Sequence, residues 1–272
     1  MRHSLSVFLL LTLTACSLFS PAPEGDAPSR LSAEETYTQA KAKLNEGDFE
    51  AAIKQYEDLQ SRYPYGRYAQ QAMIEIAYAY YRQGEAESSV AAAERFIKQY
   101  PKHQNIDYVY YLKGLANFHG EISMLGSFSE QDPTERDPKA AQDSFDAFKE
   151  LVTLFPDSKY APDARVRMQY LVNALAKHEL HVARYYQRRG AYIAAVNRAQ
   201  AVLVLYPGSP ATRDALEIMV QGYDALGMDN LRDDAKRVLA QNSALPVITQ
   251  PGVPEDAAAP AKREKRWWQF WK

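Results

Sequence analysis

A fixed spacing between glycine and proline residues constrains the fold of this chain more than any other feature. Gly47, Gly84 and Gly190 each lie 17 residues before a proline that follows a tyrosine. Gly47 and Gly84 are 37 residues apart, and so are Gly190 and Gly227. Such a period is typical of repeated helix pairs, because glycine lets the chain reverse between two helices and proline ends the second helix.

The segments between these residues are alanine-rich with apolar residues at helical spacing, and strand-like alternation is scarce. Small residues recur where paired helices are expected to cross: Ala40, Ala77 and Ala183, then Ala52, Ser89 and Ala195. The glycine-to-proline distance resembles the tetratricopeptide repeat. We therefore predict an all-α fold, a superhelical solenoid of about five helix pairs in which each pair buries its apolar face against its neighbours.

The predicted helix pairs are 31–46 with 49–62, 67–83 with 86–99, 104–119 with 138–155, 160–189 with 191–205, and 210–226 with 229–241. Two irregularities interrupt the period. The third pair carries an insertion at 120–138, and the segment 160–189 is unusually long. We expect that segment to form either one long helix or two helices broken near Lys177 and His178.

The first 15 residues have the order of a secretory signal peptide: a basic start, a short apolar run and small residues. The fragment Leu13-Thr14-Ala15-Cys16 resembles the lipobox of bacterial lipoproteins, in which the cysteine is acylated and cleavage occurs just before it. Cys16 is the only cysteine in the 272 residues. Several acyl chains on Cys16 would hold the protein on a membrane. In that family a serine directly after the cysteine, here Ser17, implies sorting of the lipoprotein to the outer membrane. The alternative for Cys16 is a free cysteine in an ordinary signal peptide.

Four regions follow from these features. Residues 1–15 are the predicted signal peptide, and 16–30, with three prolines, are a lipidated tether. The repeat domain is 31–241, divided into 31–64, 67–101, 104–156, 160–207 and 210–241. Residues 242–272 form a tail.

The search for catalytic chemistry finds no support for an enzyme. The chain has 32 basic and 34 acidic residues, without the excess of positive charge that nucleic-acid binding favours. It has no phosphate-binding glycine loop, no GxSxG and no HExxH. His178 and His181 are three residues apart, but two imidazoles without a third ligand make a poor metal site. We predict no cofactor and no bound metal.

Two clusters indicate binding surfaces. The first is a proposed peptide-binding group of tyrosines and arginines: Arg62, Tyr63, Tyr65, Arg67, Tyr68, Tyr78 and Tyr81. Tyrosine and arginine are effective anchors for a bound peptide, although core packing between repeats is the alternative for many of these tyrosines. The second is a basic group suited to an acidic partner surface: Arg184, Arg188, Arg189 and Arg198. A solvated face is the alternative for these arginines.

The tail ends in a basic and aromatic stretch: Lys262, Arg263, Lys265, Arg266, Trp267, Trp268, Phe270 and Trp271. All three tryptophans of the chain are in it. Basic residues beside tryptophans suit the interface of an anionic membrane. We expect this stretch to bind lipid or a partner groove; a tail with no specific docking is the alternative.

The lipobox, the proline-rich tether and the five repeats together resemble the repeat-containing lipoproteins of the β-barrel assembly machinery of the bacterial outer membrane. The most specific segments are DFEAAIKQYEDLQSRYPYGRYAQQAMIEIAYAYYRQGE (48–85), DPKAAQDSF (137–145), FPDSKYAPDARVRM (155–168) and VNRAQAVL (196–203), with ERDP (135–138) in the insertion.

The resemblance implies a non-catalytic scaffold, lipid-anchored at the periplasmic face of the outer membrane. It implies that the C-terminal repeats, including Arg198, face the last periplasmic domain of the barrel-forming subunit BamA. It also implies that the N-terminal repeats, including 62–81, face unfolded outer-membrane proteins and an extended segment of a partner lipoprotein. The alternative function is a periplasmic repeat lipoprotein that scaffolds cell-wall or secretion/pilus assembly.

Overall fold

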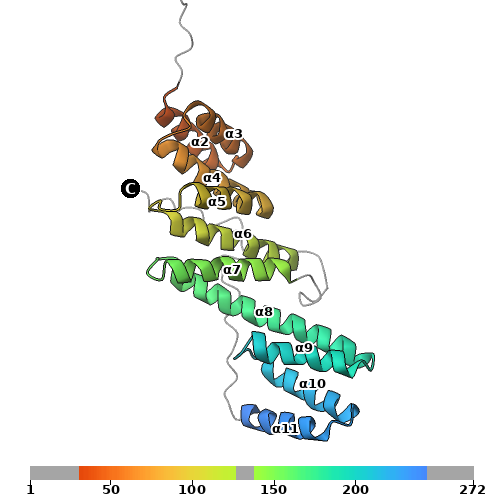
Figure 1. The fold of residues 1–272 in the computed structure, drawn as a ribbon. Helices are drawn as coiled ribbons and strands as arrows, with labels where there is room; N and C mark the ends of the chain where they lie inside the picture. The colour runs from red at the N-terminus through yellow and green to blue at the C-terminus, as the bar shows by residue number, and fades with distance from the viewer. Residues whose placement is uncertain (1–30, 127–137, 244–272) are drawn as a thin grey trace, which may run out of the picture.

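The computed structural model describes residues 31–126 and 138–243 of the chain. Within these ranges the chain forms ten α-helices and no strand, and the helices stack one after another into an elongated solenoid (Figure 1). The predicted all-α solenoid is thereby confirmed. The insertion at 127–137, Cys16 with the tether, and the tail from 244 lie outside the described residues.

Each pair consists of a first helix and a second helix that run in opposite directions. The first helices are α2 (Ala33–Glu46), α4 (Arg67–Gln83), α6 (Ile106–Gly126), α8 (Ala161–Arg188) and α10 (Thr212–Ala225). The second helices are α3 (Phe49–Arg62), α5 (Ala86–Gln99), α7 (Lys139–Leu154), α9 (Tyr192–Leu205) and α11 (Asp229–Ser243).

Local chemistry explains where the first helices begin and end. α2 starts with a capping box, in which the Ser32 hydroxyl accepts a hydrogen bond from the Glu35 amide and the Glu35 carboxylate accepts one from the Ser32 amide. Gly47 directly follows the last residue of α2, and Gly84 directly follows the last residue of α4; their φ angles are 84° and 80°. These left-handed values favour glycine, so the two repeat glycines act as helix C-caps.

Two helices differ from the predicted boundaries or resolve an open alternative. The first helix of the third pair continues to Gly126 and does not end at 119. The residues from Glu121 to Leu125 include neither glycine nor proline, so local propensity favours continuation. α8 is a single helix from Ala161 to Arg188, and no break occurs near Lys177. Between Ala164 and Arg188 the segment has no proline or glycine to interrupt the backbone hydrogen bonds.

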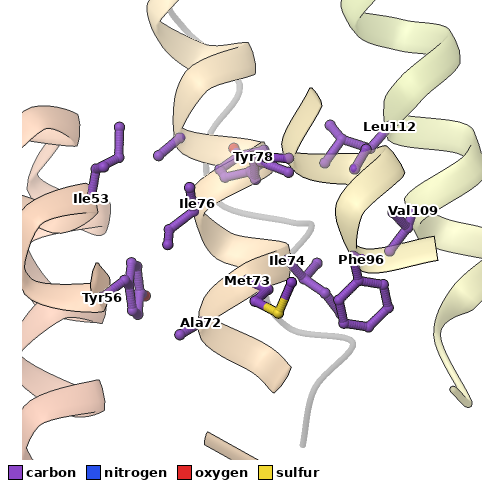
Figure 2. Close-up of a cluster of buried hydrophobic side chains, with 14 of the residues drawn as sticks. Ile53, Tyr56, Ala72, Met73, Ile74, Ile76, Tyr78, Phe96, Val109 and Leu112 are labelled. Carbon is purple, nitrogen blue, oxygen red and sulfur yellow. The ribbon is translucent and has the colours of Figure 1, made fainter. Parts of the chain in front are cut away.

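The small residues that the period aligned lie where paired helices cross. Ala40, Ala77, Ala183, Ala52, Ser89 and Ala195 have no exposed surface. At two crossings a serine hydroxyl also donates to the facing backbone: Ser89 to the Ala77 carbonyl at 2.8 Å, and Ser144 to the Gly114 carbonyl at 3.0 Å. Larger side chains such as Tyr56 and Phe96 fill the space between successive helices (Figure 2).

Gly114 permits a close crossing of α6 and α7. A Cβ at this position would lie 2.5 Å from ring atoms of Phe148, which is fully buried in α7. A Gly→Ala change in a helix ordinarily adds about 1 kcal/mol of stability. Here we expect Gly114→Ala to lower the free energy of unfolding by about 2 kcal/mol, because the core is overpacked. Urea unfolding checks this, and the second change Phe148→Leu should recover part of the loss. A Gly114→Ala protein as stable as the parent would contradict the close contact between Gly114 and Phe148.

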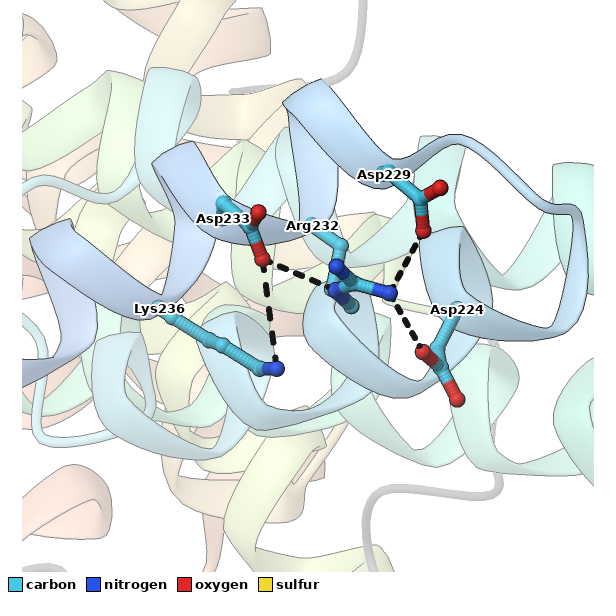
Figure 3. A network of polar contacts seen from close by, with 5 residues as sticks. All are labelled: Asp224, Asp229, Arg232, Asp233 and Lys236. Carbon is cyan, nitrogen blue, oxygen red and sulfur yellow. Dashed lines mark hydrogen bonds and ion pairs between the residues drawn. The ribbon is translucent and has the colours of Figure 1, made fainter.

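Arg232 holds the last hairpin together. Its guanidinium donates to Asp229 at 2.6 Å, Asp233 at 2.9 Å and Asp224 at 3.0 Å, and thus joins α10 to α11 across their turn (Figure 3). Hydrogen bonds to Asp233 and Asp224 raise the pKa of Arg232 above its usual value. The carboxylates are largely exposed, so the network positions the final helix more than it stabilises it.

Candidate functional site

Polar and aromatic side chains join successive first helices, and we call the surface that they form the first-helix face. At its N-terminal end Glu75 of α4 is only 2% exposed. One of its oxygens, Oε1, accepts from Lys41 of α2 at 2.6 Å and from Tyr37 of α2 at 3.1 Å. Gln71 contributes a longer bond at 3.3 Å. The contact is therefore a buried ion pair, with two neutral donors, between the first two repeats.

Two buried polar atoms in and beside this network have no hydrogen-bond partner among the described residues. Glu75 Oε2 and the Tyr56 hydroxyl are both buried there without a hydrogen bond. Burial raises the pKa of Tyr37 and of Tyr56 well above the usual value, and the Glu75 carboxylate adds to both shifts. The two phenols therefore stay protonated far into the alkaline range.

The first-helix face continues between α6 and α8. The Tyr111 hydroxyl donates to Asp163 at 2.6 Å, and Arg167 donates to the same carboxylate oxygen at 2.6 Å. Tyr160 stacks on Tyr111 with ring centroids 4.8 Å apart. Burial, followed by the Asp107 carboxylate, raises the pKa of Tyr160 to about 12. The half-buried rings of Tyr111 and Tyr160 give this part of the face an aromatic surface.

The structure divides the predicted peptide-binding cluster among three places. Tyr78 is 8% exposed and accepts from Arg82 at 2.8 Å, so it belongs mainly to the core; Tyr81 lies beside it, half-buried. Arg62 points to Asp58 on its own helix, and the Tyr63 hydroxyl donates to the Leu31 carbonyl. Tyr65 is 90% exposed in the turn that follows.

Two residues of the predicted cluster, Arg67 and Tyr68, lie beside Tyr37 of the Glu75 network. Arg67 donates to the Tyr68 hydroxyl at 2.7 Å, and the Tyr68 ring lies 5.5 Å from that of Tyr37. Sequence reasoning did not select Glu75, Lys41 or Tyr37. The available signal was Glu75 itself, a single charge within the apolar run AMIEIAYAY, where an unpaired charge is too costly to bury.

The four predicted arginines also take separate roles. Arg184 pairs with Asp214 of α10 at 2.6 Å and so belongs to the first-helix face. Arg188 is exposed at the end of α8, and Arg189 lies over the Tyr185 ring at 4.8 Å. Arg198, on the second helix α9, pairs with Glu179 at 3.1 Å. These exposed pairs contribute little to stability and leave the arginines accessible to a partner.

The exposed side of α9, which we call the α9 face, carries large apolar residues near both of its ends, with the exposed polar residues Asn197 and Gln200 between them. The sequence reasoning did not predict these exposed apolar residues. Ile193 is 60% exposed and Val204 is 68% exposed, three turns apart on one line of the helix. Leu205, 61% exposed, shares a second line with Arg198. Val204 and Leu205, exposed next to each other at the C-terminal end of α9 with Arg198 nearby, indicate an interaction surface. The signal was the run AVLVL, which is apolar on more sides than one packing face requires.

Neither a metal-binding cluster nor a membrane-spanning helix is found in the described ranges. His178 and His181 lie one turn apart in α8, and no group of three or more potential metal ligands occurs among residues 31–126 and 138–243. In the same ranges no helix has the length and apolar character needed to cross a membrane. Cys16 and the eight predicted tail residues, which lie between 262 and 271, are outside the part that the structure describes.

Paired helices in a solenoid, with an aromatic first-helix face and exposed apolar residues on α9, define a helical-repeat protein suited to binding other polypeptides. The chain belongs to the YfiO family, described as outer membrane lipoproteins, whose family model matches residues 29–238. The resemblance drawn from the sequence is thereby confirmed.

Curated relatives match nearly the whole chain and are named outer membrane protein assembly factor BamD. The protein of Neisseria meningitidis serogroup A is 40% identical over 98% of this chain and 98% of its own. That of Xylella fastidiosa Temecula1 is 36% identical over 89% and 82%, and that of Vibrio cholerae 35% over 88% and 98%. Among solved structures, the MamA protein aligns at 18% identity over 79% of this chain and 100% of its own, with a TM-score of 0.32, which is too distant to support an argument.

Proposed function

We propose that this chain is an outer-membrane protein assembly factor that works by binding and not by catalysis. The observation that carries the proposal is the exposed apolar pair Val204 and Leu205 at the C-terminal end of α9, with Arg198 on the same line of the helix as Leu205. A soluble repeat does not need so much exposed apolar surface on a second helix. The names of the BamD relatives supply the process in which that surface would act.

The α9 face is the proposed contact with the last periplasmic domain of BamA. An exposed apolar pair near an arginine suits a partner with an apolar patch and an acidic rim, since charge complementarity orients the encounter and buried apolar area supplies affinity. Arg198 lies at the border of this face, and Arg184, Arg188 and Arg189 lie around the end of α8. Other Bam lipoproteins are further proposed partners.

The N-terminal part of the first-helix face is the proposed site for extended segments of unfolded outer-membrane proteins. Arg67 and the half-buried rings of Tyr68 and Tyr37 supply cation–π, stacking and hydrogen-bonding groups without requiring one partner sequence. Tyr65 and Arg62 extend this surface at the turn. Acylation of Cys16 would anchor the protein to the periplasmic face of the outer membrane, with 17–30 as a tether.

Affinity purification of the tagged full-length protein from detergent-solubilised outer membranes tests the proposal. We expect BamA as a stoichiometric partner. Val204→Asp and Arg198→Glu should each lower its recovery by roughly tenfold, because a charge enters the apolar pair or reverses near it.

Arg213→Glu provides the matched control for this purification. Arg213 is an exposed arginine that pairs with Glu217 within α10 and is not on α9, and its reversal should leave recovery unchanged. Unchanged recovery with the two α9 variants would refute the proposed contact. Recovery of cell-wall or pilus proteins without BamA would favour the alternative scaffold.

A further inference from the structure

A groove lies at the edge of the solenoid where one helix pair connects to the next. Its walls are the turn between α5 and α6 and the turn between α7 and α8, and its volume is about 470 Å³. The lining residues are Pro101, Lys102, His103, Gln104, Ile106, Asp107, Leu154, Phe155, Pro156, Asp157 and Ser158. This volume falls within the roughly 300–1,000 Å³ of ligand pockets.

The walls of this groove, which we call the turn groove, are held in place by contacts between the two repeats. The Ser158 hydroxyl donates to Asp107 at 2.7 Å and bridges the two turns. The Phe155 ring lies 5.6 Å from Tyr110, and the His103 ring lies edge-on to Phe96 at 5.1 Å. Leu154 nevertheless remains 56% exposed. An exposed leucine beside an aromatic ring, in a groove with fixed walls, indicates a site for an apolar or aromatic side chain.

We propose that the turn groove is the docking site of this chain's own C-terminal aromatic stretch, residues 267–271. Trp267, Trp268, Phe270 and Trp271 are within five residues of one another, and the neighbouring Lys265 and Arg266 are basic. Aromatic rings inserted against Leu154 and Phe155 bury apolar area on both sides of the contact.

The path of the chain supports this occupant. Because the two helices of a pair run in opposite directions, each second helix ends at the edge where the next first helix begins. α11 therefore ends, at Ser243, on the same side as the turn groove but roughly 20 Å further along α8, because α8 has 28 residues and α9 to α11 have only 14 or 15 each. From α11 to α8 the path crosses three helix spacings, roughly 30 Å. Residues 244–266 span up to about 75 Å when extended, which is ample.

The charges of the turn groove and of the tail are complementary. Asp107 and Asp157 line the turn groove together with one lysine, Lys102. Burial lowers the pKa of His103, so this ring is neutral near pH 7 and adds no positive charge. The groove is thus slightly acidic, and the basic residues before the tail's tryptophans meet carboxylates at its rim.

Tryptophan fluorescence tests the docking directly, because all three tryptophans are in the tail. In the full chain purified in mild detergent, we expect the indole emission to be blue-shifted and shielded from acrylamide. Leu154→Arg should red-shift the emission and increase the quenching constant about twofold, since exposed indole collides freely with the quencher. Circular dichroism verifies that the variant remains folded.

Val238→Arg is the matched control, since Val238 is a partly exposed apolar residue on α11 close to the exit of the tail. It should leave the fluorescence unchanged. Emission that is identical in the parent and in Leu154→Arg overturns the proposal. A blue shift that appears only when anionic vesicles are added would show that the tail binds lipid, and this also overturns the proposal. Shielding that disappears on dilution would assign the groove to the tail of a second copy and also overturn it. None of these outcomes depends on BamA binding, so this proposal and the proposed function fail separately.

Discussion

Replacement of Lys41 by methionine is expected to lower the free energy of unfolding by about 3 kcal/mol. Among the residues that the structure describes, Lys41 is the cation that pairs with the buried Glu75 carboxylate, at 2.6 Å, and Glu75 is 2% exposed. Removing one member of a buried ion pair leaves the other charge desolvated without compensation, which typically costs about 3–5 kcal/mol. We expect the lower value, because Tyr37 and Gln71 still donate to Glu75. Urea unfolding followed by circular dichroism measures the change.

Two further variants separate burial from charge in this experiment. Lys43→Met removes an ion pair of similar length, 2.8 Å to Glu46, from the exposed side of the same helix and should leave stability almost unchanged. The double change Lys41→Met with Glu75→Met should recover most of the loss, because apolar residues replace both charges. A Lys41→Met protein as stable as the parent would show that Glu75 is not a buried, charged group in the folded chain.

The free energy of unfolding is also expected to fall steeply above about pH 10. Burial raises the pKa of four tyrosines in the first three repeats: Tyr37, Tyr56, Tyr78 and Tyr108. The unfolded chain titrates these phenols near pH 10, so the folded state binds more protons above that pH. Their contribution is complete below pH 10 and is lost as the pH rises toward the folded-state pKa values.

Well above pH 10 each such tyrosine contributes a slope of up to about 1.4 kcal/mol per pH unit, and the four together lose at most about 4 kcal/mol between pH 10 and 11. This is a large fraction of the stability of many domains, roughly 5–15 kcal/mol. Urea unfolding at a series of pH values, with the ultraviolet absorbance of tyrosinate, measures the coupling.

Tyr56→Phe is the matched variant for the alkaline experiment. Because its hydroxyl is buried without a partner among the described residues, its removal should cost little at neutral pH and should lower the alkaline slope by one proton. Stability that is independent of pH up to about 11 would contradict the burial of these phenols.

Local signals in the sequence predicted most of the fold. Gly47 and Gly84 marked helix ends because a left-handed backbone favours glycine, and the structure gives them φ of 84° and 80°. Ala40 and Ala77 marked crossings because only small side chains fit there. The end of α6 was wrong, because the start of the insertion contains no signal that stops a helix, and the helix simply continues to Gly126.

The candidate surfaces were predicted less well, because an amphipathic helix does not reveal what its polar residues meet. Tyr78 and Tyr65 looked alike in the sequence, but one is 8% exposed and the other 90%. The partners Lys41 and Glu75 are 34 residues apart, and only the stacking of α2 on α4 brings them to 2.6 Å.

By itself the sequence determined the all-α class, the period of the helix pairs and the resemblance to outer-membrane assembly lipoproteins, because each rests on residues close together or on a regular spacing. Only the tertiary structure decided which side chains form surfaces. The exposure of Ile193 and Val204 on α9, the buried pairing of Glu75 and the groove between two turns depend on how neighbouring repeats pack. Packing sets burial, and burial decides whether a tyrosine, a carboxylate or a leucine stabilises the core or remains available to a partner.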